Sequence, residues 1–154
     1  MTGTITQQDL FGVLTPDYVH AISDVAEKVT FQAGETVYRK GDPAEFFYIV
    51  QRGEITLRLP GKEEVSIQIA QLSRGAVFGS CFAFSRASYA VTAQATENTE
   101  LLKIENKVLK QMMERDPRMG YILQSHLCEV YFGRYLDTMQ KLQAIIMNLP
   151  LETV

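Results

Sequence analysis

Short runs of β-branched and aromatic residues, each ended by turn residues, fill the chain from Val29 to Ile104. The run Phe46–Val50 is apolar throughout, as in a buried strand. On either side of Pro60-Gly61-Lys62, apolar and polar residues alternate, which predicts a hairpin with one face in the core. The alternating apolar residues are Ile55, Leu57, Leu59, Val65, Ile67 and Ile69. Six or more short strands at this spacing indicate a sandwich or a small barrel.

Helical patterns flank the strand region on both sides. Thr15-Pro16 is typical of a helix start, and apolar residues at helical spacing follow it as far as Ala26. After the strands, Asn106 is predicted to cap one helix and Asp116-Pro117 to begin a second, longer one. We therefore expect a single domain over residues 1–154, with N-terminal helices over about 1–28, a β-barrel over 29–104 and C-terminal helices over 106–149.

The last predicted helix carries two apolar stripes. From Cys128 onward, apolar residues recur in alternate steps of four and three, the spacing of a heptad seam. The seam consists of Phe132, Tyr135, Met139, Leu142, Ile146 and Leu149. It favours a homodimer formed through this helix, with packing inside the chain as the alternative. The second stripe, which contains Met119, Ile122, Leu123, Leu127 and Val130, is placed to pack on the domain itself.

Composition and charge exclude several classes of protein. Hydrophobic residues make up 46% and charged residues 21% of the chain, and the net charge is −3. With no basic run longer than Arg39-Lys40, direct DNA binding by this chain is not expected. The polar start Met1–Leu10 and the lack of an apolar stretch of about 18 residues predict a cytoplasmic protein without a signal peptide or membrane span.

The residue types that carry metal or catalytic chemistry are sparse. Cys81 and Cys128 are far apart and are interpreted as two buried thiols, and His20 and His126 have no second ligand nearby. We therefore expect no metal site. No nucleophile–base arrangement or pair of carboxylates is placed for acid–base work, so we expect no enzyme. A metal-dependent barrel enzyme of the cupin type would need histidines inside the barrel, and residues 29–104 contain none.

A series of short motifs runs through the strand region in a fixed order. They are Phe31-x-x-Gly34-Glu35, Gly41-Asp42, Phe47-Tyr48-Ile49-Val50-x-x-Gly53-Glu54, Gly75-x-x-Phe78-Gly79 and Leu101-x-x-Ile104. In order and spacing they resemble the cyclic-nucleotide-binding domain family, which includes catabolite-activator-type regulators, protein kinase A regulatory subunits and cyclic-nucleotide-gated channels. The resemblance covers about Leu10 to Arg134. It implies a mainly β fold with flanking helices: an eight-stranded jelly-roll (double-stranded β-helix) barrel, an N-terminal helical segment and two C-terminal helices.

The resemblance also locates a candidate ligand site, the cassette Phe78–Ala95. In the family, a glutamate after Phe-Gly binds the ribose, and an arginine in Pro-Arg-Ala-Ala-Thr-Val-x-Ala pairs with the cyclic phosphate. Aligned without gaps, Ser80 stands in place of the glutamate and Tyr89 in place of the arginine. Serine is too short for the ribose contact, and tyrosine brings no charge. Loss of a charged partner costs a few kcal/mol, or about two to three decades of affinity, so cAMP or cGMP binding in the family's usual manner is not favoured.

Several residues of the cassette stay candidates for contact with a ligand. They are Phe78, Gly79, Ser80, Cys81, Arg86, Tyr89, Ala90, Val91 and Thr92. Arg86 could swing in to hold an anion, the alternative being a solvated loop arginine. The apolar run Cys81–Phe84, with Val77 and Phe78, is either barrel core or a pocket for an apolar or aromatic ligand, or a pocket filled by its own side chains.

Two hypotheses for the function follow. The first is a non-catalytic sensor or regulatory module of signal transduction, which binds a cyclic nucleotide or another small anionic ligand as effector and moves the C-terminal dimer helix. The second is a degenerate, ligand-free domain that acts as a dimerising interaction scaffold. Both predict a homodimer and an unidentified output protein. Phe82 and Tyr89 filling the barrel would favour the scaffold, and Arg86 pointing inward would favour the sensor.

Overall fold

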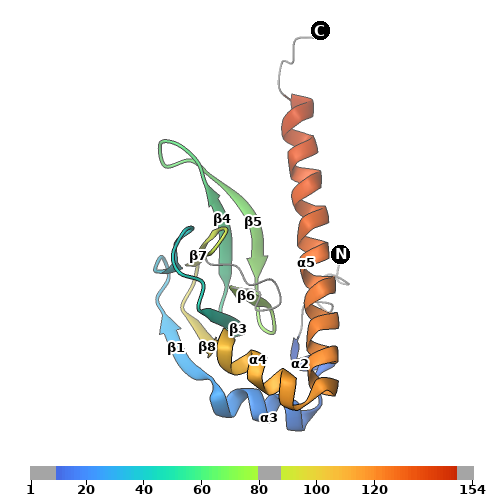
Figure 1. Ribbon diagram of the computed structural model, residues 1–154. Helices are drawn as coiled ribbons and strands as arrows, with labels where there is room; N and C mark the ends of the chain where they lie inside the picture. The colour runs from blue at the N-terminus through green and yellow to red at the C-terminus, as the bar shows by residue number, and fades with distance from the viewer. Residues whose placement is uncertain (1–9, 80–87, 149–154) are drawn as a thin grey trace.

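The computed structural model describes residues 10–79 and 88–148 of the 154-residue chain. Its strands are β1 (Glu27–Phe31), β2 (Thr36–Tyr38), β3 (Phe46–Arg52), β4 (Ile55–Pro60), β5 (Ser66–Leu72), β6 (Val77–Gly79), β7 (Thr92–Ala95) and β8 (Thr99–Glu105). Helices α2 (Leu10–Val13) and α3 (Pro16–Val25) precede the strands, and α4 (Asn106–Arg115) and α5 (Pro117–Asn148) follow them (Figure 1).

The strands form two antiparallel four-stranded sheets. Their orders are β1-β8-β3-β6 and β2-β7-β4-β5, and apolar side chains from both sheets meet in one shared core. The predicted fold, a mainly β jelly-roll with helices at both ends, is confirmed. Among the described residues, the free edges of the two sheets are β1 and β6 in the first and β2 and β5 in the second.

Strand β3 shows why one run of the sequence is apolar throughout. Tyr48 and Val50 belong to the core between the sheets, whereas Phe47 and Ile49 belong to the core between this sheet and the helices. Because successive side chains of a strand point to opposite faces, a strand covered on both sides needs apolar residues at every position. The helices α2, α3, α4 and α5 supply the second cover, with Leu10, Ile22, Leu109 and Leu123 among their buried residues.

The helix starts follow the sequence signals at two of three places. Thr15 caps α3 by accepting a hydrogen bond from the Tyr18 amide, and Asp116 caps α5 by accepting one from the Met119 amide. The predicted cap Asn106 is wrong. Asn106 is the first residue of α4, its neighbour Glu105 occupies the cap position, and the Asn106 side chain donates to the Ala44 carbonyl instead. The local pattern predicted that the Asn106 side chain would cap the helix, but its amide is bound to a carbonyl that is distant in the sequence.

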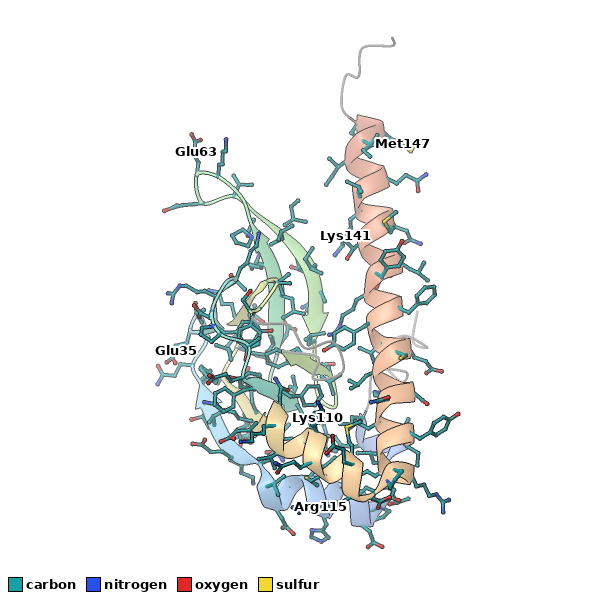
Figure 2. All side chains as sticks on the ribbon, viewed as in Figure 1. Glu35, Glu63, Lys110, Arg115, Lys141 and Met147 are labelled. Carbon is teal, nitrogen blue, oxygen red and sulfur yellow. The ribbon has the colours of Figure 1, made fainter. Side chains whose placement is uncertain are left out.

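The β4–β5 hairpin differs from the prediction at its outer end. Val65 is 64% exposed and Ile67 is also exposed, so the predicted apolar face of β5 reaches the core only from Ile69 onward. The hairpin extends past the other strands, with Glu63 near its tip (Figure 2). Glu63 and Glu64 both have positive φ angles, which make the tight turn without a glycine. Within residues 10–79 and 88–148, no second layer covers the outer part of the hairpin.

Helix α5 is long enough to run beside the sheets and to extend beyond α4 (Figure 1). Its buried residues are Met119, Gly120, Leu123, His126, Leu127, Val130 and Arg134. The predicted second stripe does pack on the rest of the chain, with Ile122 half-buried at its edge. The interpretation of both cysteines as buried thiols is wrong for Cys128, which is exposed. Cys81 lies outside the described residues.

Candidate functional site

The cassette predicted from the sequence is divided in the structure. Phe78 and Gly79 lie in β6, and Thr92 begins β7. Tyr89 is buried, Ala90 is exposed, and Val91 is half-buried. Ser80, Cys81, Phe82 and Arg86 lie outside the described residues. The cassette departs from the family pattern at Ser80 and Tyr89, and of these two residues the structure describes only Tyr89.

Four aromatic side chains fill the barrel interior beside the cassette. The rings of Tyr38 and Tyr89 stack with their centroids 3.6 Å apart, and those of Tyr48 and Phe78 stack at 5.1 Å. Tyr38 also lies 6.0 Å from Tyr48 and 6.1 Å from Phe78, centroid to centroid. All four side chains are buried. One member of this aromatic cluster, Tyr89, stands at the position where the resemblance implies the phosphate-binding arginine.

The hydroxyl of Tyr89 is bound to the backbone of the chain. It donates a hydrogen bond to the Phe46 carbonyl oxygen at 2.9 Å and accepts one from the Phe46 amide nitrogen at 3.2 Å. Burial raises the pKa of Tyr89, and it raises the pKa of Tyr48 further, with the neighbouring Tyr89 hydroxyl adding to the effect. Tyr89 therefore acts as a neutral interior group that ties the cassette to the start of β3.

The backbone around Tyr89 is also occupied. Its amide donates to the Asp42 carbonyl, and its carbonyl accepts from the Gly41 amide. The Thr92 hydroxyl oxygen, expected to face a phosphate, accepts a hydrogen bond from the Lys40 amide at 3.1 Å. These bonds join the cassette to the turn that follows β2. The described part of the phosphate turn thus serves to hold the barrel together.

Gly79 has a structural reason to be glycine. Its φ angle is +103°, and a Cβ atom there would lie 2.8 Å from the Phe46 carbonyl oxygen. Both the backbone conformation and the close approach to β3 exclude a larger residue. The glycine of the Phe-Gly motif thus positions β6 against β3, whatever ligand the cassette contacts.

Helix α5 is attached to one free edge of each sheet. The Arg134 guanidinium donates through Nη2 to the carbonyl oxygen of Val77 in β6. The Lys141 ammonium donates to the carbonyl oxygens of Gln68, at 2.7 Å, and Ile69, at 3.2 Å, in β5. Figure 2 shows Lys141 on the side of α5 that faces this hairpin. Because Arg134 and Lys141 are two helical turns apart, one face of α5 lies along both edges.

The opposite side of α5 is exposed and apolar. The five seam residues Phe132, Tyr135, Met139, Leu142 and Ile146 are between 44% and 61% exposed. Leu136 and Met147 are also exposed beside the seam. Exposed apolar patches of this kind on a helix mark surfaces that bind another protein chain. The structure thus separates the two sides of α5, one toward the barrel and one toward solvent.

Sequence reasoning missed three residues of this region: Tyr38, Arg134 and Lys141. Arg134 had a detectable signal, since the buried stripe that contains Leu127 and Val130 reaches position 134 at the next helical step. Tyr38 had none, because its place against Tyr89 depends on how two segments of the fold meet. Lys141 resembles any solvated lysine of a helix until β5 is placed beside it.

Other kinds of site find little support within residues 10–79 and 88–148. No group of three or more His, Cys, Asp or Glu side chains there could hold a metal ion. No helix in the same part of the chain is long and apolar enough to span a membrane. An open groove of about 700 Å³ lies away from the cassette, between the N-terminal helices and the first sheet, with Phe11, Val19 and Leu102 in its lining.

Comparison with known proteins identifies similar sequences and folds. Residues 28–116 match the sequence model of the cyclic nucleotide-binding domain. A cAMP-dependent protein kinase regulatory subunit of Mucor circinelloides is 31% identical over 94 residues, which are 61% of this chain and 22% of that protein. The chain spans about a third or less of the length of the curated relatives it matches.

Two solved structures share the fold. The c-di-GMP-responsive global regulator CLP of Xanthomonas campestris superposes with a TM-score of 0.74 at 19% identity, over 88% of this chain and 66% of that one. The catabolite activator protein of Thermus thermophilus gives 0.72 at 23% identity, over 88% and 63%. At these identities the likeness concerns the fold alone.

Proposed function

Because the chain belongs to the cyclic nucleotide-binding domain family, we propose that it is a non-catalytic regulatory module that dimerises through α5 and transmits a small-ligand signal through this helix. One observation carries the proposal. A single helix is bonded to the free edges of both sheets on one side and presents an unpartnered apolar seam on the other. A change at the barrel edge would therefore move the surface that binds the second copy.

The seam favours a second copy of this chain as its partner. Its residues repeat at heptad spacing, and a seam of this kind is complementary to itself when two α5 helices pack together. The rings of Phe132 and Tyr135, 6.0 Å apart by their centroids, form its aromatic start. The solved relatives named above are regulators, which is consistent with a domain that controls another activity.

Light scattering on the full chain tests the dimer. We expect twice the mass of 17.4 kDa at micromolar concentration. Leu142→Glu places a charge in the seam and should give the single-chain mass. Gln111→Glu is the matched control, because it adds the same charge at an exposed position of α4, away from the seam, and it should leave the dimer intact. A wild-type protein of single-chain mass at tens of micromolar would contradict the proposal.

A specific observation favours a second candidate, the ligand-free scaffold. The stacked Tyr38 and Tyr89 rings fill the interior, and the Tyr89 hydroxyl is already bonded to Phe46. The predicted contributions of Phe82 and Arg86 lie outside the described residues. Calorimetric titration with cAMP, cGMP and cyclic di-GMP separates the two candidates. Saturable heat together with a rise in melting temperature supports the sensor, and neither effect at millimolar ligand supports the scaffold.

A further inference from the structure

The N-terminal helices leave a groove open beside the first sheet. Its volume is about 700 Å³, and residues of α2, α3, β1, β3 and β8 line it. Strand pairing places Lys28 of β1 directly opposite Leu102 of β8, and both line the groove. Gln51 lines it from β3, the strand on the other side of β8. The groove therefore reaches across three strands and is bordered by two helices.

Apolar side chains of the core reach the surface in this groove. Leu102 and Leu14 are 2% and 7% exposed, and both belong to the core between the first sheet and the helices. Phe11 of α2 and Val19 of α3 are half-buried and pack against that core. All four residues line the groove. An apolar side chain that enters it would remove further apolar surface from water, which is favourable.

The charge of the lining has one sign. Lys28 and Arg74 line the groove and no Asp or Glu does, although the whole chain has 18 acidic and 15 basic residues. Both side chains are exposed, and the ion pair formed within residues 10–79 and 88–148 joins Arg52 to Glu100 instead. The Arg74 Cζ atom lies 6.0 Å from the ring centroid of Phe11, so its positive charge is beside an apolar surface. A carboxylate on a bound partner would complement both charges.

We propose that this groove binds a segment of another protein in which apolar side chains are flanked by Asp or Glu. The apolar side chains would bury against Phe11 and Val19, and the carboxylates would meet Lys28 and Arg74. The open shape favours a chain segment, because sites for small molecules enclose most of the surface of their ligand. The inference goes beyond the dimerising module, since the groove and the seam of α5 are made by different elements.

The groove has the composition of a protein-binding surface rather than that of an uncovered part of the core. Apolar contact area supplies affinity, while charges at the rim steer the approach of a partner and select it by its sign. His20, Ser23 and Gln51 add hydrogen-bonding groups to the same lining. A partner that fits all three features is amphipathic and acidic.

Panning a phage-displayed library of random linear peptides against the full chain tests the proposal. We expect the enriched peptides to combine apolar residues with Asp or Glu. Synthetic fluorescein-labelled copies should bind with Kd of about 100 micromolar or tighter in fluorescence anisotropy. Because the rim charges are exposed, binding should weaken as sodium chloride is raised from about 50 to about 500 mM.

Charge reversal locates the binding in the groove. Lys28→Glu and Arg74→Glu should each weaken peptide binding several-fold, and the double variant by at least about tenfold. Lys110→Glu is the matched control, because it makes the same change at an exposed position of α4, and it should bind as the wild type does. A peptide whose acidic residues are replaced by lysine should bind the double variant more tightly than it binds the wild type.

Circular dichroism checks that the variants fold, and the two single variants decide if the double variant does not. Enriched peptides without acidic residues, equal binding by the groove variants and by Lys110→Glu, or no peptide with Kd below about 1 millimolar would overturn the proposal. So would a wild-type dimer that the double variant cannot form, because the groove would then bind a second copy of the chain.

The variant Leu142→Glu separates this inference from the proposed function. It lies in the seam and outside the groove, so it should lose the dimer and keep peptide binding. A dimeric wild-type protein that binds no peptide would overturn the groove and leave the dimerising module standing. A single chain that binds acidic peptides through Lys28 and Arg74 would do the reverse.

Discussion

The rings of Tyr38 and Tyr89 stack face to face in the barrel interior, with their centroids 3.6 Å apart and their planes 13° from parallel. Tyr38 ends β2, and Tyr89 lies just before β7, the strand paired with β2. A stacked aromatic pair contributes about 0.5–1.5 kcal/mol beyond the area it buries. At the cassette position where the family resemblance expects an arginine for phosphate, this chain has a tyrosine that stabilises the barrel through its own contacts.

Removal of the Tyr89 hydroxyl should destabilise the fold. Tyr89→Phe keeps the stacked ring but leaves the Phe46 amide and carbonyl without this partner, which should lower the free energy of unfolding by about 1–3 kcal/mol. Urea denaturation measures the change. Tyr121→Phe is the control, since Tyr121 is 75% exposed on α5, and it should be nearly neutral. Equal stability of the two variants would mean that the Tyr89 hydroxyl contributes nothing.

Stability should fall at alkaline pH. Burial raises the pKa values of Tyr38, Tyr48 and Tyr89 in the folded protein. Above the ordinary tyrosine pKa of about 10, the unfolded chain loses protons that the folded protein keeps. The contribution of these three tyrosines to the free energy of unfolding is therefore fully present below about pH 10 and is lost as the pH rises above it. The expected slope is about 1.4 kcal/mol per pH unit for each such tyrosine.

Urea unfolding between pH 8 and pH 11.5 measures this slope. Tyr48→Phe removes one titrating hydroxyl from the interior and should make the decline shallower. Tyr121→Phe removes an exposed hydroxyl outside the seam and should leave the slope as in the wild type. A decline of the same steepness in both variants would assign the alkaline instability to other groups.

Two glycines should respond in opposite directions to the same substitution. Gly79→Ala puts a Cβ on a residue with φ of +103° and 2.8 Å from the Phe46 carbonyl oxygen, so we expect a loss of about 1–3 kcal/mol. Gly133→Ala lies inside α5, where an added Cβ meets no atom within 4 Å, and should gain about 0.5–1 kcal/mol. Thermal unfolding of the two variants compares them. A neutral Gly79→Ala would show that β6 can move away from β3.

The contact between Lys141 and β5 should protect the end of α5. Lys141→Gln loses the charged donor to Gln68 and Ile69 and should raise amide hydrogen exchange in β5 and in the last turns of α5. Because the site is partly exposed, global stability should change by less than about 1 kcal/mol. Lys110→Gln, on the exposed side of α4, is the control and should leave this exchange unchanged. Unaltered exchange in Lys141→Gln would show that the Lys141 contact does not hold the end of α5 against β5.

Much of the fold was predictable because its signals are local. The alternation in β4, the continuous apolar run of β3 and the Asp116-Pro117 start of α5 each depend on residues that are near one another in the sequence. The predictions failed where a distant group intervened. Asn106 binds Ala44 instead of capping α4, and Val65 is left exposed because no layer covers the outer hairpin.

The sequence alone determined the barrel, the flanking helices, the heptad pattern of α5 and the substitutions at Ser80 and Tyr89. It did not determine what Tyr89 contacts or that Arg134 is buried. Arg134 meets Val77, 57 residues away, and Tyr89 is bonded to Phe46, 43 residues away. Only the tertiary structure brings such groups together, because periodicity reports which residues share a face of one element and not which edge of a sheet that face meets. The candidate site therefore changed from the cassette to the contact between the barrel and α5.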